Sequence, residues 1–514
     1  IAQSMSTSMA KPMGDKIADA LEAARLIAVN NIVESSLLKR QDITVLNKAG
    51  FLKPIIKGWY LLDADLSNAI TGESVLWQES YWAFIASYLN HRLDNSYSLS
   101  AEQSLDIHTG VNLMPSQILI GNSLKKNQII QLPKSLSLSL FSASDLPVEA
   151  DIYQGVNIYP LAEALVKVGP LYFRNQPQEI MLALKKVAPN ELLRVLLSAG
   201  NAEASGRLAG AYRHMGMNKE ADALAKTLKQ AGFTVKETDP FERPLPIIHS
   251  MRPQSPHASR IALHWQQLSE EIRPLLDAPI KPPKDIEASL IALEESYVHD
   301  AYNSLSIEGY KVTEALIEKV RSGDWRPDEN PQDQQHLDAM AARGYFEAYK
   351  QVTDSIRKLH KQTLTLGDLE HTTGDWYRAL FAPMVRAKMF AAEDLAGYRT
   401  RPVFIRGSRH TPLPKEALMD AMGTLFDCLA EEPHPLVRAI LGHWLIGYIH
   451  PFPDGNGRTA RFLMNALLVS SGYPWTIIRL EQREAYMQAL EALSTEQRPA
   501  PFVELIQESM QFKW

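Results

Sequence analysis

The chain has 514 residues, 45% of them hydrophobic and 22% charged, a globular composition that at this length favours roughly two to four domains. A single cysteine excludes a disulfide framework, and a net charge of −6 gives no whole-chain basic signature for nucleic acid. No apolar run reaches about 18 residues, so we expect a cytoplasmic protein with no membrane-spanning helix and no membrane partner.

The first domain, residues 14–70, is predicted to be a small DNA-binding module. It begins with a helical run, followed by a short helical pair around Ser36–Ala49. A hairpin is predicted over residues 51–62 with Gly58 at its tip, and this order suits a winged helix-turn-helix. Residues 35–62 carry five bases against one acid, which suits contacts to the phosphates of duplex DNA. The alternative is a winged helix that binds only another protein.

Residues 71–235 are predicted to form an α+β domain. Apolar residues alternate with period two in Ser135–Ala143, which indicates a half-buried strand, and residues 177–232 have helical spacing. The strand pattern of this domain and the Gly58–Tyr60 wing resemble AbiEi-type antitoxins over about residues 14–235. That resemblance implies a regulator with a winged-helix module.

Residues 236–284 are predicted to be a linker. Prolines cluster near both of its ends and interrupt regular secondary structure. Residues 285–514 then form a separate domain, which begins with a predicted helix over residues 286–309.

The end of that helix carries a polar pair. Gly309 suits a helix C-cap, where the backbone takes a positive φ. Ser304 and Glu308 then lie one turn apart on one face. A carboxylate is electrostatically disfavoured at a helix C-terminus, so Glu308 needs a reason to be there. The alternative is an exposed acid without a function.

A hairpin is predicted over residues 396–407. Its arms are Ala396–Arg399 and Val403–Gly407, and polar and proline residues follow the second arm. An ordinary surface hairpin and a peptide-binding flap are both consistent with this stretch.

Residues 450–461 are the most informative string, His-Pro-Phe-Pro-Asp-Gly-Asn-Gly-Arg-Thr-Ala-Arg. Apolar runs on both sides predict a helix, a tight loop and a second helix. Two glycines flank Asn456 and allow the backbone to approach a ligand closely. The second helix then offers its unpaired N–H groups to an anion.

Four side chains of this string favour nucleotide chemistry. Arg458 and Arg461 share a helix face and can clamp phosphate oxygens. Asp454 is a hard oxygen ligand that can carry Mg²⁺ between phosphates. His450 can take a proton near neutral pH. The alternative is a simple turn with arginines that point to solvent.

This string resembles the signature of Fic-domain proteins, HPFx[D/E]GNGRxxR, at every fixed position. The resemblance implies transfer of AMP from ATP to a Ser, Thr or Tyr hydroxyl of a target protein or of the chain itself. It implies that His450 deprotonates the hydroxyl, that Asp454 holds Mg²⁺, and that Arg458 and Arg461 bind the outer phosphates. The implied phosphate cradle comprises Gly455, Asn456 and Gly457.

Two further strings fit the same resemblance. Residues 304–309 resemble the family's inhibitory motif [S/T]xxxE[G/N], which implies an ion pair from Glu308 to Arg461 that competes with the γ-phosphate. The second hairpin arm resembles the family's flap, which pairs with the target's backbone as an added strand. The implied flap residues are Val403, Phe404, Ile405 and Arg406.

The predicted fold is therefore multidomain: a winged helix-turn-helix, a middle domain of mixed α and β structure, and an all-α Fic core with a small β-hairpin flap. An autoinhibited adenylyltransferase is the function that the complete motif favours. The alternatives are a DNA-binding, antitoxin-like regulator whose Fic core senses nucleotide, and an enzyme that also removes AMP with Glu308 as the base. The target and the oligomeric state, including a homodimer, stay open.

Overall fold

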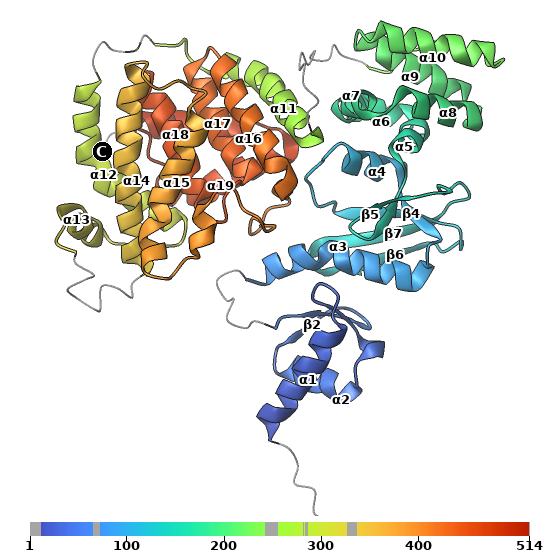
Figure 1. Ribbon diagram of the computed structural model, residues 1–514, viewed down its shortest axis with the longest axis horizontal. Helices are drawn as coiled ribbons and strands as arrows, with labels where there is room; N and C mark the ends of the chain where they lie inside the picture. Colours follow the sequence, from blue (N-terminus) through green and yellow to red (C-terminus); the bar gives the residue numbers. More distant parts are fainter. Residues whose placement is uncertain are drawn as a thin grey trace, which may run out of the picture. The chain divides into compact units, whose positions relative to one another are not determined.

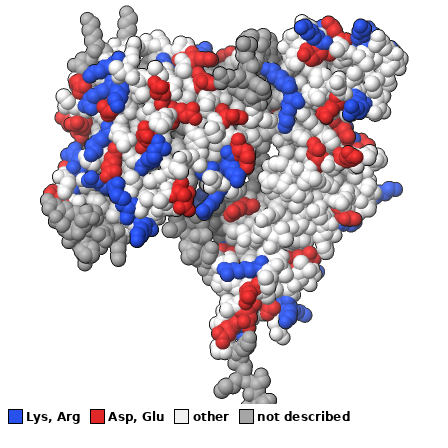
Figure 2. All heavy atoms as spheres, in the orientation of Figure 1, with Lys and Arg blue, Asp and Glu red and all other residues white. Residues whose placement is uncertain are grey.

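The computed structural model describes residues 12–64, 72–241, 255–280, 282, 286–325 and 337–512. The chain divides into two compact units, which are considered separately. Unit 1 comprises residues 1–109, 114–243 and 404–407, and unit 2 comprises residues 110–113, 244–403 and 408–514. On the face drawn in Figure 2, acidic and basic side chains are interspersed. None of the described helices has the length and apolar content needed to cross a membrane.

Unit 1 begins with a small module of helices and a sheet (Figure 1). Its elements are α1 Met13–Ile27, β1 Ile32–Glu34, a 3-10 turn Ser35–Leu37, α2 Arg40–Lys48, β2 Leu52–Ile56 and β3 Trp59–Leu62. The strands pair antiparallel in the order β1-β3-β2. Ala24, Val33 and Leu46 are fully buried in a core shared by both helices and the sheet. The predicted hairpin is confirmed, and Gly58 takes φ +90° at its tip.

The predicted helical pair around Ser36–Ala49 is wrong in its first member. Residues 35–37 form one 3-10 turn, and α2 is the only full helix of the pair. Two adjacent serines explain this, because Ser side chains favour turns and caps over helix interiors. The strand β1 was not predicted from the sequence.

The middle of unit 1 is a four-stranded sheet with α3, Gly72–Leu93, along one side (Figure 1). Its other elements are β4 Tyr97–Leu99, α4 Ala101–His108, β5 Gln117–Asn122, β6 Gln128–Leu132 and β7 Leu136–Ser142. The strand order is β4-β5-β7-β6, and β5 and β7 run parallel. The half-buried strand is confirmed, since Leu138 and Leu140 are buried while Ser137 and Ser139 are only partly covered. A hairpin of β8 Asp151–Tyr153 and β9 Val156–Ile158 follows.

The rest of unit 1 is helical, as the spacing over residues 177–232 predicts. The helices are α5 Leu161–Lys167, α6 Pro170–Asn175, α7 Pro177–Lys186, α8 Pro189–Ala199, α9 Ala202–His214 and α10 Asn218–Gln230. Gly206 and Gly210 lie on the face of α9 that meets residues 236–239, where an added Cβ would overlap the backbone.

Unit 2 is a helical body, and α18 lies at its centre in contact with α12, α14, α15 and α17 (Figure 1). Its helices are α11 Pro256–Ile272, α12 Glu287–Ile307, α13 Glu314–Ser322, α14 Leu337–His360, α15 Leu369–Arg386, α16 Leu418–Glu431, α17 Pro435–Ile449, α18 Asn456–Ser470, α19 Arg483–Glu496 and α20 Ala500–Gln511. Both α17 and α18 are buried on almost every side. Their connection therefore starts and ends in the core of unit 2.

The predicted linker is wrong over Pro256–Ile272, which forms α11. Ser255 caps this helix by accepting a hydrogen bond from the Ala258 N–H, and Pro256 occupies the first turn, where no N–H is needed. Ile261, Leu268 and Ile272 are fully buried in the core of unit 2. The proline taken as a helix breaker therefore starts a helix.

Candidate active site

His450 ends α17 in a left-handed conformation, with φ +54°. Its Nδ1 lies 3.2 Å from the carbonyl oxygen of Gly447. A carbonyl only accepts, so Nδ1 carries the proton, and Nε2 of the neutral ring keeps a free lone pair. Burial, aided by the charge of Arg399, lowers the pKa of His450 to about 4. The imidazole is therefore an unprotonated base at neutral pH.

Arg399 fixes the backbone of this turn, a role that the sequence did not reveal. Its side chain is almost fully buried, and Nε donates to the carbonyl oxygen of His450 at 2.8 Å. The other nitrogens donate to the carbonyls of Arg401 and Leu413. The Arg399 N–H also donates to Pro451 O at 2.9 Å. The only feature of the sequence that could have indicated this role is the position of Arg399 directly after Gly397 and Tyr398.

The loop between the helices is closed by Asn456. Its amide donates to the Phe452 carbonyl at 2.8 Å and accepts from the Phe452 N–H at 2.9 Å. Phe452 is buried and stacks on Tyr377, with ring centroids 4.2 Å apart. The Asn456 side chain is thus turned inward and its polar atoms are bonded to the loop, and a phosphate contact from this residue stays a prediction. The residue positions the loop.

Two glycines shape the start of α18. Gly455 takes φ +74°, and an added Cβ would overlap Phe381. A Cβ on Gly457 would overlap the Glu308 carboxylate and crowd Arg461. Since the first-turn N–H groups of a helix have no intrahelical partner, this bare backbone is suited to an anion.

Arg458 is enclosed by rings. Its side chain has no exposed surface, and its guanidinium carbon lies 5.1 Å from the Tyr310 ring centroid and 4.9 Å from that of Phe381. Nη2 lies 3.5 Å from the Asp454 carboxylate. Nε and Nη1 are buried without a hydrogen-bond partner in the described part of the chain. Unsatisfied guanidinium donors are costly to bury, so they indicate a site for an anion.

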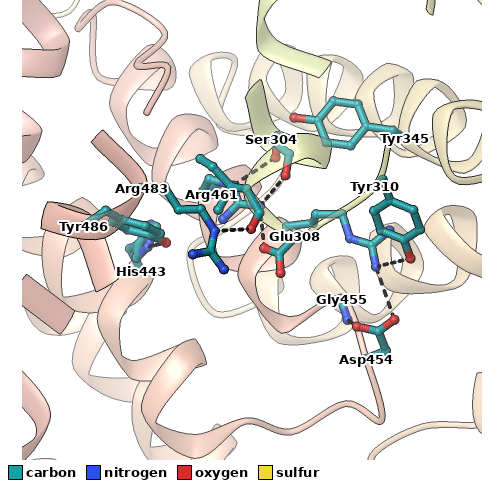
Figure 3. Close-up of polar contacts among 12 residues, drawn as sticks. Ser304, Glu308, Tyr310, Tyr345, His443, Asp454, Gly455, Arg461, Arg483 and Tyr486 are labelled. Carbon is teal, nitrogen blue, oxygen red and sulfur yellow. Dashed lines mark hydrogen bonds and ion pairs between the residues drawn. The ribbon is translucent and has the colours of Figure 1, made fainter. Parts of the chain in front are cut away.

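Arg461 is held by the end of α12 (Figure 3). Its Nε donates to Ser304 Oγ at 2.9 Å, and its Nη2 donates to Glu308 at 2.7 Å and to the Ser304 carbonyl at 3.1 Å. Burial alone would raise the pKa of Glu308, but the charges of Arg461 and Arg458 outweigh it and keep that pKa below its ordinary value. Glu308 is therefore a carboxylate at neutral pH, and the expected ion pair is present.

The end of α12 has the expected geometry. Gly309 takes φ +93°, the Gly309 N–H donates to Ser306 O, and the Tyr310 N–H donates to Leu305 O at 3.1 Å. These paired bonds are those of a glycine-terminated helix. They bring Tyr310, which the sequence did not single out, against Arg458; its place directly after Gly309 was the only hint.

The predicted hairpin over residues 396–407 is absent. The described chain has no strand there: residues 392–395 form a 3-10 turn, and residues 402–405 lead without pairing into a turn. The backbone of Arg399 is bonded to the loop after α17, so it cannot enter a ladder. Val403, Phe404 and Ile405 are half-buried and Arg406 is exposed. Their role as a target-binding flap stays a prediction.

Part of unit 2 matches a known protein family. Residues 352–468 match the model of the Fic/DOC family. This segment is a Fic domain. It runs from α14 into α18, so the helix α12 that carries Ser304 and Glu308 lies before the matched part of the chain.

Relatives of the Fic domain are named adenylyltransferases. "Protein adenylyltransferase Fic" of Nematostella vectensis is 32% identical over 209 residues, 39% of this chain and 44% of that protein. "Protein adenylyltransferase fic-1" of Caenorhabditis elegans is 34% identical over 111 residues, 21% of this chain and 22% of that protein. The chain thus spans less than half the length of these curated relatives. A solved structure, Fic-1 (residues 134–508) from C. elegans, is 19% identical and covers 65% of this chain and 89% of its own, with a TM-score of 0.35.

The Fic domain also fits a metal ion held mainly by phosphates. The Asp454 side chain is 55% exposed, and one of its oxygens accepts from the Gly455 N–H at 2.6 Å. Mg²⁺ commonly binds one or two carboxylates together with substrate phosphates. Among the described residues, no group of three or more His, Cys, Asp or Glu side chains forms a metal site. Asp454 supplies one exposed carboxylate of this kind, and its role as the Mg²⁺ ligand stays a prediction.

Proposed function

We propose that this chain is an autoinhibited protein adenylyltransferase, which transfers AMP from ATP to a Ser, Thr or Tyr hydroxyl of a target protein or of itself. The supporting observation is the segment of residues 450–461, the loop after α17 and the start of α18. It carries an unprotonated base, His450, and two buried arginines that have unused N–H groups. The names of the relatives point to the same reaction.

In the proposed reaction the target hydroxyl oxygen attacks the α-phosphorus of ATP. The bond between that phosphorus and the α,β-bridging oxygen breaks, and pyrophosphate leaves with the bonding electrons. The hydroxyl proton goes to Nε2 of His450, which a general base can do from hydrogen-bond distance. Arg458, Arg461 and the first-turn N–H groups of α18 bind the phosphate oxygens and stabilise the charge that develops on them.

Mg²⁺ held by Asp454 would neutralise part of the triphosphate charge when bound. Asn456 and Arg399 act through other residues: the first closes the loop and the second fixes the His450 backbone.

At rest, Glu308 occupies the guanidinium of Arg461 that would otherwise meet the γ-phosphate. The two acceptors compete for Nη2, which donates to Glu308 at rest, and the carboxylate beside it also repels a phosphate from the neighbouring N–H groups. ATP would then bind in a pose from which transfer does not proceed.

Intact-mass spectrometry after incubation with Mg-ATP tests the proposal. Wild type should gain little mass, whereas Glu308→Gly should gain one AMP unit per modified site. The matched control, Glu308→Gly with His450→Ala, keeps the freed arginine and lacks the base, so it should gain none. Absence of labelling in Glu308→Gly, on itself and on proteins of a cell lysate, would contradict the proposed activity.

A second candidate function, DNA binding by the first module, is supported by the exposed face of α2. Ile43 and Leu46 face the module's core, while the outward face is entirely polar and contains no acid. The exposed residues are Arg40, Gln41, Thr44, Asn47 and Lys48. Arg, Gln, Asn, Lys and Thr are side-chain types that bind base edges in the major groove. Lys57 at the hairpin tip is exposed, whereas Lys53 is paired with Asp63 at 2.9 Å.

Electrophoretic mobility shifts with duplex DNA at low salt test this candidate. Arg40→Ala with Asn47→Ala should remove sequence preference, and Lys48→Glu with Lys57→Glu should weaken binding to every sequence and reduce its salt dependence. Lys229→Glu, an exposed charge reversal on α10, is the matched control. If the control weakens binding equally, or if no duplex is shifted, the module is not a DNA reader.

A further inference from the structure

The chain that follows Glu308 continues across the second arginine of the site. Gly309 turns the backbone at φ +93°, and the Tyr310 N–H is bonded to Leu305 O at 3.1 Å. Arg483 secures the same helix end by donating to the Ile307 carbonyl at 2.8 Å. Glu308 and Tyr310 therefore belong to one turn of chain. Glu308 contacts Arg461 (Figure 3), and Tyr310 contacts Arg458.

The Tyr310 ring covers Arg458. The guanidinium carbon lies 5.1 Å from its centroid, and Arg458 Nη2 lies 3.4 Å from the Tyr310 hydroxyl. The Phe381 ring centroid lies 4.9 Å from the same guanidinium carbon. The Arg458 side chain has no exposed surface, although its Nε and Nη1 lack partners among the described residues. In this state the two donors are buried, and Tyr310 is one of the two aromatic residues packed against their guanidinium.

We propose that Tyr310 is the second half of the resting block: its ring covers Arg458 while Glu308 occupies Arg461. This inference rests on the proposed adenylyltransferase function. Productive binding of the triphosphate requires both side chains to leave. Since both are carried by one helix end, loosening of the last turn of α12 frees both arginines together, whereas loss of Glu308 alone frees only one.

The test compares variants in the Glu308→Gly background, with two readouts: MgATP affinity by titration and AMP transfer by intact mass. A desolvated cation–π contact changes an equilibrium constant by roughly thirtyfold. The triphosphate must overcome this free energy to displace the Tyr310 ring from Arg458. Tyr310→Ala should therefore tighten MgATP binding by about ten- to thirtyfold and raise transfer. Tyr310→Phe keeps the ring and should keep the weaker affinity of its parent.

Tyr302→Ala is the matched control, because Tyr302 is a half-buried tyrosine within α12 that packs on the helical core, as Tyr310 does just after the helix. If Tyr302→Ala tightens MgATP binding as much as Tyr310→Ala, general loosening of α12 explains the effect and the inference is wrong. Weaker MgATP binding in Tyr310→Ala would also overturn it, since Tyr310 would then support Arg458 rather than block it. Tyr310→Leu, which keeps apolar bulk, gives the same comparison if the Ala variant does not fold.

The two proposals fail differently. If Glu308→Gly transfers no AMP but Tyr310→Ala still tightens MgATP binding, the cover on Arg458 stands and the adenylyltransferase function falls. If Glu308→Gly transfers AMP and Tyr310→Ala changes neither readout, the reverse holds.

Discussion

Graded removal of the contacts to Arg461 should give graded activity. Three acceptors hold this guanidinium: Ser304 Oγ, the Ser304 carbonyl and the Glu308 carboxylate, at 2.9, 3.1 and 2.7 Å. The carbonyl cannot be removed by a side-chain change, so Ser304→Ala and Glu308→Gly remove one contact each. Each lost contact lowers the free energy that is needed for a phosphate of ATP to replace Ser304 and Glu308 as the partner of Arg461.

The magnitudes follow from the two contacts. A hydrogen bond to a charged group contributes about 1.5–3 kcal/mol, and the Glu308 side chain is 30% exposed, so the lower half of that range applies. Glu308→Gly should then raise AMP transfer by roughly ten- to thirtyfold, and Ser304→Ala, at about 0.5–1.5 kcal/mol, by roughly two- to tenfold. The double variant should rise by less than the product, because both residues act on one guanidinium.

The same series should move stability in the opposite direction. Arg461 is 5% exposed, so loss of Glu308 leaves a buried charge less well paired, at a cost of about 1–3 kcal/mol in the free energy of unfolding. MgATP should restore stability more in Glu308→Gly than in wild type, since a tighter ligand stabilises more. Initial rates from intact mass and thermal melts with and without MgATP measure both effects. Equal rates in wild type, Ser304→Ala and Glu308→Gly would refute this account of Arg461.

Three further predictions concern the base and its support. His450→Ala should keep the fold and MgATP affinity but lose about 10²–10⁴-fold in transfer, measured in the Glu308→Gly background; unchanged transfer would remove the base from the mechanism. Burial and Arg399 lower the pKa of His450 to about 4, so its neutral form persists from pH 8 down to about pH 5. Transfer should be flat over that range and fall towards pH 4, and a midpoint near pH 6.5 would show an ordinary imidazole. The stability linked to this group is present above pH 6.5 and is lost as the pH falls through about 4. Arg399→Lys should lower the free energy of unfolding by about 1–3 kcal/mol for each carbonyl left unbonded, measured by urea denaturation; a neutral result would mean that water replaces the guanidinium.

The loop after α17 was predictable because its constraints are local. Gly455 lies within the string and takes φ +74°, a conformation that glycine adopts without strain. The pairing of Glu308 with Arg461 could be expected only through the family resemblance, since 153 residues separate them. The Tyr310 contact to Arg458 spans 148 residues and belongs to no motif, so the position of Tyr310 directly after Gly309 was the only hint in the sequence.

Two of the errors, the hairpin over residues 396–407 and the linker at Pro256, have one physical origin. The pattern of residues 396–407 favours strands, but a strand needs a partner, and the Arg399 backbone is already bonded to the loop at Pro451. Likewise Pro256 was taken as a breaker without regard to Ser255 before it, which caps the helix. In both cases a local propensity was outweighed by a hydrogen bond that satisfies the backbone elsewhere.

Charge balance supports the proposal that ATP exchanges with the helix end rather than adding to it. At rest Arg458 and Arg461 face Asp454 and Glu308, so two positive charges meet two negative ones. When Glu308 leaves, one positive charge of the two buried arginines is no longer compensated. A triphosphate with its metal can supply the missing negative charge. A ligand shifts such an equilibrium only by its difference in affinity for the two states. If the proposed function holds, ATP reaches both arginines only in the state in which the helix end of α12 has moved, so a target or partner that loosens this helix end would favour transfer.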